Sequence, residues 1–374
     1  MAWLGEELPE DRQDGATPFA PRTNKDLIEE ASFARRRDLF ADPDIVFFDT
    51  TSIYFEGEGG ETIGQRRHSK DRRPDLKQMV VGMVLDHNGN PICREFWPGN
   101  TADVKSLVPI VERLKSRFGI GSVCIVADRG MIGAKTLAEV ELRKWQYILG
   151  VRRRSSTEAN AVVARAGRYA EVHPKSEDRD DPSPLKVKEV WGDKSLVGNK
   201  GYRKYLRAGG KQFAVDEDKI KEEARYDGKW VLPTNTDLAT DEVALKYKQL
   251  WMVEDVFRSM KSLLDTRPIY HKRGETIRGY VFCTFLALLL RKELEDRLAR
   301  KEWKLEWADV IRDLDNLVEM EVTIGGKGYV ICGQTTGVAG KVFQSCGVAL
   351  PHCNLLEMDY FREHGVEDEF EVSD

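Results

Sequence analysis

The sequence predicts a mixed α/β fold, in which helices flank the faces of a β-sheet. Short apolar runs of strand length alternate with segments in which apolar residues recur at helical spacing. The order is strand, hairpin, helix, strand, helix, strand, which is typical of a sheet with helices packed on it. The chain has 374 residues, 41% hydrophobic and 32% charged, which is enough for one large domain with an insertion or for two domains.

The first half of the chain contains the clearest elements. A short helix is predicted at 26–40 and a buried strand at 45–50. Strands at 78–85 and 91–97 form a hairpin, because the intervening Asn88-Gly89 pair accepts the positive φ of a tight turn. The periodicity then predicts a helix at 102–118, a buried strand at 122–128, a helix at 133–145 and a strand at 147–151.

The second half begins with a break in this pattern. We interpret 155–228 as an insertion, because polar loops and short mixed segments replace the earlier periodicity. Strand character returns at 229–232, and long helices are predicted at 240–264 and 276–298. We therefore divide the chain into an N-terminal arm with a short helix (1–40), two parts of a core (41–154 and 229–300) separated by the insertion, and a C-terminal region with an acidic tail (301–374).

Charge and cysteine content limit the choice of protein class. The formal net charge is −5, so no global basic excess indicates a nucleic-acid partner, although basic clusters occupy the middle of the chain. The six cysteines form no CxxC pair, and no signal peptide is evident, which predicts a cytoplasmic protein. The longest apolar run, 280–290, is shorter than the roughly 20 residues that span a bilayer, so we expect no membrane segment.

Two aspartates end predicted strands. Asp49 follows the run Val46-Phe-Phe, and Asp128 follows Val126-Ala. Carboxylates from adjacent strand ends can share a divalent cation, and oxygen ligands in an incomplete cage suit Mg²⁺ or Mn²⁺. The alternative is chance, because a chain with 63 acidic residues places some of them after strands.

A third carboxylate, Glu254, lies in the predicted helix 240–264. Tyr247, Glu254 and Lys261 are seven residues apart, nearly two helical turns, and so share one face, which Leu250 and Arg258 flank. An acid, a phenol and an amine on one stripe suit a metal and a phosphate. The alternative is an ordinary amphipathic helix with one polar face.

Taken together, these segments resemble the DDE transposases of bacterial insertion sequences, in the branch with a Tyr-Arg-Glu-Lys signature. The resemblance rests on Val46-Phe-Phe-Asp-Thr-Thr, on Val126-Ala-Asp-Arg-Gly-Met, and on the helix from Tyr247 through Glu254 to Lys261. The segments Thr234-Asn-Thr and Arg267-Pro-Ile-Tyr-His are also similar to that branch. The order and spacing of these motifs, over about residues 40–350, are more specific than any one of them.

The resemblance implies an RNase H-like core with a β-rich insertion between the second Asp and the Glu. It implies that Asp49, Asp128 and Glu254 bind two Mg²⁺ or Mn²⁺ ions and catalyse DNA cleavage and strand transfer. Tyr247 and Lys261 would contact the phosphate near the cut. The implied partners are double-stranded DNA, as transposon ends and target, and a second copy of the chain on DNA. Some relatives open a DNA hairpin with an aromatic wedge, for which Trp230 is a candidate; its alternative interpretation is a core aromatic.

Two features depart from the family pattern. Leu250 stands where the signature Arg is expected, and Arg258, one turn beyond Glu254, is a replacement charge at a different place. The chain also begins about 45 residues before Asp49, where family members usually carry a region that recognises transposon ends. Two alternatives therefore stay open: a truncated or inactive remnant that binds DNA without catalysis, and an RNase H-like nuclease without strand transfer.

Basic residues supply candidate DNA contacts. Arg152, Arg153 and Arg154 follow the predicted strand beside Asp128, so we expect them to face the substrate groove. Lys and Arg bind DNA phosphates without reading sequence. Other basic clusters, such as the one at 66–73, are better explained as solvated surface.

Overall fold

The computed structural model describes most of the chain. The described residues are 1–13, 16, 21–36, 44–57, 59, 63–66, 73–120, 123–131, 133–150, 168–172, 185–189, 206–209, 212–215, 230–324, 327–333, 335–350 and 356–357. They divide into two compact units, Met1–Leu288 and Leu289–Asp374, and each unit is described by itself. The five-part division predicted above stays a prediction.

A five-stranded mixed sheet forms the centre of the first unit, with strand order β3-β2-β1-β4-β5. Its strands are β1 (Asp44–Tyr54), β2 (Gln78–Leu85), β3 (Pro91–Pro98), β4 (Val123–Ala127) and β5 (Gln146–Leu149). The β1, β2 and β3 strands pair antiparallel, whereas β4 runs parallel to both β1 and β5. The predicted mixed α/β sheet with flanking helices is therefore confirmed.

Two segments of the sheet show how sequence produces it. β2 and β3 join through a tight turn at which Gly89 has a φ of 81°, as the Asn88-Gly89 pair predicts. β1 extends beyond the predicted 45–50 to Tyr54, because residues 51–54 continue the antiparallel pairing with β2.

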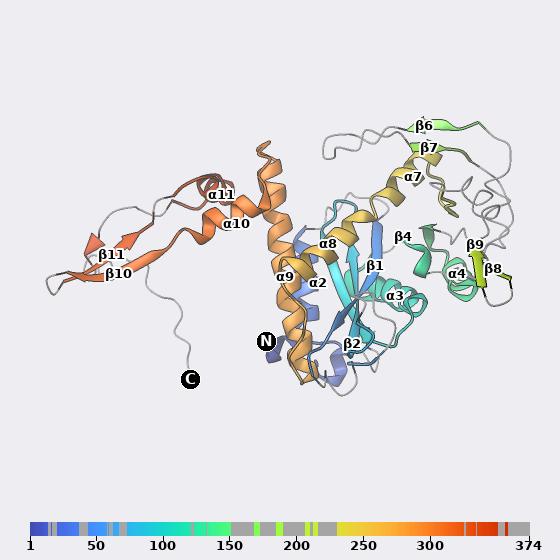
Figure 1. Cartoon of the computed structure of the whole chain (residues 1–374), viewed down its shortest axis with the longest axis horizontal. Helices are drawn as coiled ribbons and strands as arrows, with labels where there is room; N and C mark the ends of the chain where they lie inside the picture. The colour runs from blue at the N-terminus through green and yellow to red at the C-terminus, as the bar shows by residue number, and fades with distance from the viewer. Residues whose placement is uncertain are drawn as a thin grey trace. The chain divides into compact units, whose positions relative to one another are not determined.

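Helices cover both faces of this sheet (Figure 1). On one face lie α8 (Trp251–Ser262) and the first part of α9 (Gly274–Ala299), together with α7 (Thr240–Lys248). On the other face lie α3 (Leu107–Phe118) and α4 (Ala134–Leu142). The long helix predicted at 276–298 is confirmed by α9.

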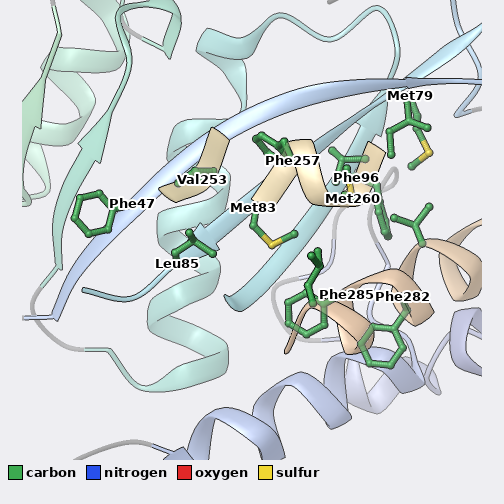
Figure 2. Packing of buried hydrophobic residues seen from close by; sticks show 14 of the residues in the cluster. Phe47, Met79, Met83, Leu85, Phe96, Val253, Phe257, Met260, Phe282 and Phe285 are labelled. Carbon is green, nitrogen blue, oxygen red and sulfur yellow. The ribbon is translucent and has the colours of Figure 1, made fainter. Parts of the chain in front are cut away.

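The alternation of side chains along β1 divides the hydrophobic core into two clusters. On the α8 face, Phe47 belongs to one cluster with Met83 of β2 and with Val253 and Phe257 of α8 (Figure 2). Residues of α9 complete this cluster. Phe48, the neighbour of Phe47, points to the opposite face, where the α3 residues Leu107, Ile110, Val111 and Leu114 cover it. Because both faces are covered, β1 is apolar on both sides up to Asp49.

Helix α2 (Asn24–Arg36), which follows the short α1 (Ala2–Gly5), attaches to this core through a network of charges. The guanidinium of Arg117, on α3, lies 2.8 Å from Glu29 Oε2, 2.9 Å from Glu30 Oε1 and 3.0 Å from Asp26 Oδ1, all on α2. It also lies 3.3 Å from Glu95 Oε1 on β3. The side chain of Arg117 is only 2% exposed, so these ion pairs are shielded from solvent and salt.

Burial changes the proton affinity of this network. Desolvation raises the pKa of the fully buried Glu29, although Lys25 and Arg117 oppose that rise. The cations Lys25 and Arg117 hold the pKa of Asp26 well below its ordinary value despite burial. Burial thus favours the neutral form of both acids, but their net pKa shifts are opposite, because Asp26 also accepts hydrogen bonds from Thr23 and Lys25.

A second buried cation, Arg94 of β3, joins the sheet to α9. Its Nη1 donates a hydrogen bond of 2.6 Å to the carbonyl oxygen of Val281. Its guanidinium lies 4.8 Å from the ring centre of Phe282 and 5.3 Å from that of Phe285. Burial lowers the pKa of Arg94 to about 10, which still leaves the side chain charged at neutral pH.

Short hairpins occupy the segment between β5 and α7. β6 (Ala170–Val172) pairs antiparallel with β7 (Leu185–Val187), and β8 (Leu206–Gly209) pairs antiparallel with β9 (Gln212–Val215). These strands fall within the predicted insertion and agree with its expected β character.

The second unit combines a small sheet with two helices. β10 (Glu319–Ile324) and β11 (Lys327–Cys332) form an antiparallel pair, to which β12 (Leu356–Glu357) adds. α10 (Trp307–Asp315) and α11 (Ala339–Cys346) bury Val310 and Val342. The backbone N–H of Val338 donates a 2.8 Å hydrogen bond to Asp313 Oδ2, which links the two helices. Among the helices of the described residues, none is long and apolar enough to cross a membrane.

The Arg117 network yields a stability prediction. Arg117→Met removes the shared cation of four carboxylates, of which Asp26, Glu29 and Glu95 are buried and Glu30 is partly exposed. Removing one partner of a buried ion pair costs about 3–5 kcal/mol, and we expect a loss of that size in the free energy of unfolding, measured by urea denaturation. The control is Arg273→Met, which removes an exposed pair with Glu275 at 4.0 Å and should cost no more than about 1 kcal/mol. Equal losses in the two variants would contradict a special role of the network.

Candidate active site

Two predicted metal ligands lie at adjacent positions on neighbouring parallel strands: Asp49 within β1, just beyond its pairing with β4, and Asp128 directly after β4. Phe48 of β1 is paired with Ala127 of β4, so the next residues, Asp49 and Asp128, occupy adjacent positions at the carboxyl edge. Ala127 is in turn paired with Leu149 of β5, so Gly150 is next to Asp128 in the same row. The expectation that the two aspartates meet at one sheet edge is therefore supported by the register.

Both aspartates point to the sheet face that α7 and α8 cover. Side chains alternate along a strand, so Asp49 shares the face of Phe47, and Asp128 shares that of Val126. Phe47 and Val126 both belong to the core cluster under α8. Both aspartates are half-buried, a position that is accessible to solvent and to a ligand.

Tyr247 of α7 contacts the site directly. Its hydroxyl donates a 3.1 Å hydrogen bond to Asp128 Oδ1. The sequence analysis expected Tyr247 beside a phosphate, and the structure places it against one of the predicted metal ligands. The residue belongs to the site, and its partner there was not predicted.

Asp103 is an acidic residue of this region that the sequence analysis did not identify. The hydroxyl of Thr50 donates a 3.0 Å hydrogen bond to Asp103 Oδ1, and Thr50 is buried. Asp103 begins η2 (Asp103–Lys105), and its Oδ2 lies 3.7 Å from where a Cβ on Gly130 would be. Asp103 thus connects the residue after Asp49 with the turn after Asp128. Only the fold could reveal this contact, since the partners lie 53 residues apart in the chain.

Glu254 lies on α8, which packs its apolar face on the sheet. Val253 and Phe257 are buried there, whereas Glu254 is exposed. In the described part of the chain, no three His, Cys, Asp or Glu side chains are grouped so that they could hold a metal ion. The structure thus brings Asp49 and Asp128 together with Tyr247, and it does not add Glu254 to them as a third ligand.

The predicted single helix 240–264 is wrong, and this affects the spacing argument. α7 ends at Lys248 and α8 begins at Trp251, with a turn at Gln249 and Leu250. The turn is tightened, because the N–H of Leu250 bonds to the carbonyl of Tyr247 at 3.1 Å, three residues back. Tyr247 and Glu254 are therefore on different helices, while Glu254 and Lys261 still share a face of α8.

Leu250, at the expected signature Arg position, is a core residue. It is 7% exposed and packs in the cluster under α8. An arginine here would have to bury its guanidinium among apolar side chains, which is costly without a partner. Arg258 is 71% exposed and lies 3.2 Å from Asp255, so its charge is on the surface of α8.

Of the four remaining predicted contact residues, the structure describes only Trp230. Arg152, Arg153 and Arg154 lie outside the described residues. Trp230 is 69% exposed, so its interpretation as a core aromatic is wrong. An exposed aromatic agrees with the wedge hypothesis without testing it.

The segment after Trp230 is not the predicted strand 229–232, because the residues described there, 230–232, form none. The chain instead pairs slightly later, through a bridge between Thr234 and Ile148. Asn235 accepts a 2.9 Å hydrogen bond from the N–H of Tyr147 and donates one of 2.9 Å to the carbonyl of Trp145. Asn235 thus provides partners for backbone groups at and just before β5, which is at the edge of the sheet. The segment Thr234-Asn-Thr therefore has a structural role beside this strand.

Neither a thiol nor a phenolate of β4 and β5 is available for catalysis at neutral pH. Burial raises the pKa of Cys124 to about 11. Burial, together with a hydrogen bond to Glu141, raises the pKa of Tyr147 to about 12. Both groups therefore stay protonated at neutral pH.

The donor set fits a small hard cation. Mg²⁺ is commonly held by one or two carboxylates, with water and substrate phosphates as its other ligands. Asp49 and Asp128 supply two carboxylates in adjacent positions, and neither is sealed from solvent. These two residues fit one such ion, and the position of Glu254 leaves the full three-residue set a prediction.

The Thr50–Asp103 contact yields a second prediction. Thr50→Val removes the hydroxyl that donates to Asp103 and leaves its shape almost unchanged. Hydrogen bonds to charged groups contribute about 1.5–3 kcal/mol, so we expect a loss of that size in the free energy of unfolding, measured by urea denaturation. Thr50→Ser keeps the hydroxyl and should retain most of the stability. A Thr50→Val variant as stable as the wild type would show that this hydrogen bond does not stabilise the fold.

A protein-family model and several solved structures are similar to this chain. The family model described as "Transposase DDE domain" matches residues 40–290. A search of curated proteins found no match. Solved structures that resemble the chain include a piggyBac transposase synaptic complex with hairpin DNA, at TM-score 0.39 and 11% identity, covering 70% of this chain and 49% of that one. A Mos1 transposase paired-end complex with the left transposon end is 20% identical at TM-score 0.21, covering 39% and 44%.

The chain thus spans about half the length of the solved structures that it matches. The family model, by contrast, includes β1 to β5, α7, α8 and most of α9, and therefore both aspartates and Glu254. This match covers more than half of the sequence and does not depend on the weak structural likeness. The chain belongs to the family of transposases with a DDE domain.

Proposed function

We propose that this protein is a DNA transposase that cleaves DNA at transposon ends and joins those ends to a target. The observation that carries the proposal is the pair of carboxylates, Asp49 and Asp128, in adjacent positions at the carboxyl edge of a sheet within the matched transposase domain. Family membership supplies the reaction class, and the strand register supplies the residues.

In this proposal Asp49 and Asp128 hold a divalent ion, Mg²⁺ or Mn²⁺, and Glu254 of α8 completes a site for two. Bound divalent ions activate a water or a DNA 3′ hydroxyl and stabilise the leaving oxygen. The contribution of the chain is positional. β1 and β4 fix the two aspartates on a rigid edge, and the Tyr247 hydroxyl restrains Asp128.

The DNA backbone would be held by basic residues around this edge. Lys261 shares a face of α8 with Glu254, and Arg258 offers an exposed guanidinium on the same helix. We propose both as phosphate contacts, together with Arg152, Arg153 and Arg154. Paired transposon ends also imply a second copy of the chain, which we propose as a homodimer on DNA.

A second candidate is an inactive remnant that binds DNA without cutting it. The exposed position of Glu254, outside any grouping of metal ligands among the described residues, favours this alternative. Metal-dependent cleavage of a DNA end would exclude it. A third candidate, a nuclease without strand transfer, is distinguished by supplying pre-cut ends and a target and assaying for joined product.

Substitution of the three acids tests the catalytic assignment. Asp49→Asn, Asp128→Asn and Glu254→Gln should each abolish Mg²⁺- or Mn²⁺-dependent cleavage of a labelled transposon end, because each removes a charged ligand. Circular dichroism should show an unchanged fold. Asp255→Asn, on the residue next to Glu254, is the matched control and should retain activity. Wild-type rates in any of the three variants would remove that residue from the site.

The DNA contact of α8 gives a separate prediction. Each lost phosphate contact weakens DNA binding for all sequences and reduces the salt dependence of log K by about one unit. We expect this of Lys261→Ala in fluorescence anisotropy with end DNA, in EDTA and at several salt concentrations. The control is Lys115→Ala, an exposed lysine on α3, across the sheet. Equal salt slopes for Lys261→Ala and the wild type would contradict the contact.

A further inference from the structure

The row of residues at the carboxyl edge contains a third member besides the two aspartates. Asp49, Asp128 and Gly150 follow the paired residues Phe48, Ala127 and Leu149 of three parallel strands. The N–H of Gly150 donates a 3.2 Å hydrogen bond to the carbonyl of Ala127, which fixes Gly150 beside Asp128. Gly150 follows Ile148 by two residues, so any side chain on it would point to the α7 face.

The space that a side chain would take at this position is occupied by Tyr247. A Cβ built on Gly150 would lie 2.9 Å from Tyr247 Cζ and closer still to its hydroxyl oxygen. Real Cβ atoms do not approach other atoms so closely, so the tyrosine would have to move. The same hydroxyl donates the 3.1 Å hydrogen bond to Asp128 Oδ1. The missing side chain is therefore what lets the phenol reach the carboxylate.

We propose that Gly150 is a positioning residue of the active site, which admits the Tyr247 hydroxyl so that it can orient the Asp128 carboxylate for metal binding. This inference rests on the proposed function, because it assigns a role toward the divalent ion that Asp128 would hold. Carboxylate ligands of metals are usually oriented by such hydrogen bonds, and losing one typically weakens metal affinity about 10- to 100-fold.

The backbone does not itself require glycine here. The φ of Gly150 lies outside the left-handed region, and its N–H bond to Ala127 would persist in alanine. The nearest atoms belong to the far end of the Tyr247 side chain and not to backbone. A methyl group at 150 should therefore displace the phenol and leave the sheet intact, so the expected defect is local.

The test measures Mn²⁺ binding to the full chain, without DNA, by titration monitored with electron paramagnetic resonance. The variants are Gly150→Ala, Tyr247→Phe and the double variant. We expect each single variant to bind Mn²⁺ about 10- to 100-fold more weakly than the wild type. The double variant should match Tyr247→Phe, because the hydrogen bond can be lost only once. The control is Gly274→Ala, where an added Cβ meets no atom within 4 Å, and it should bind normally.

Three results would overturn the inference. Wild-type Mn²⁺ affinity in Gly150→Ala would show that the glycine does not govern the site, and additive losses in the double variant would show that it acts independently of Tyr247. If Gly150→Ala fails to fold, normal Mn²⁺ affinity in Tyr247→Phe overturns the inference by itself. A wild-type chain that binds Mn²⁺ and cleaves DNA keeps the proposed function in either case, whereas one that does neither removes both.

Discussion

The parallel pairing of β1 with β4 is the constraint on which the site depends. It places Phe48 opposite Ala127, and therefore Asp49 next to Asp128. Because side chains alternate along a strand, a slip of one residue would turn one aspartate to the opposite face of the sheet. The two core clusters prevent such a slip, since it would move Phe47 and Phe48 out of the apolar surroundings that each occupies.

The elements around this pair serve to hold the edge rigid. α3 and α8 pack on opposite faces of the sheet, and the hydrogen bond from the Thr50 hydroxyl to Asp103 joins β1 to η2, the turn that precedes α3. Farther away, Arg117 links α2, α3 and β3 through four carboxylates. The buried ion pairs of Arg117 stabilise the scaffold without involving Asp49 and Asp128, which stay half-buried and accessible.

The break between α7 and α8 changes how the family signature is understood. A continuous helix would have aligned Tyr247, Glu254 and Lys261 on one stripe. The turn at Leu250 instead lets α7 direct Tyr247 at Asp128 while α8 packs on β1 and β2. Leu250 contributes to the core at that turn, which gives a physical reason for an apolar residue where the signature expects arginine.

The sheet, the hairpin and most helices could be predicted from the sequence, because they depend on local periodicity and turn chemistry. The two aspartates were also identified, although Asp49 lies within β1 and not at its end. The sequence alone missed the helix break, since a tightened turn of helical residues retains the same spacing of apolar positions. It also missed Asp103 and Gly150. Their roles arise from contacts with Thr50 and Tyr247, far away in the chain, and only the tertiary structure brings those partners together.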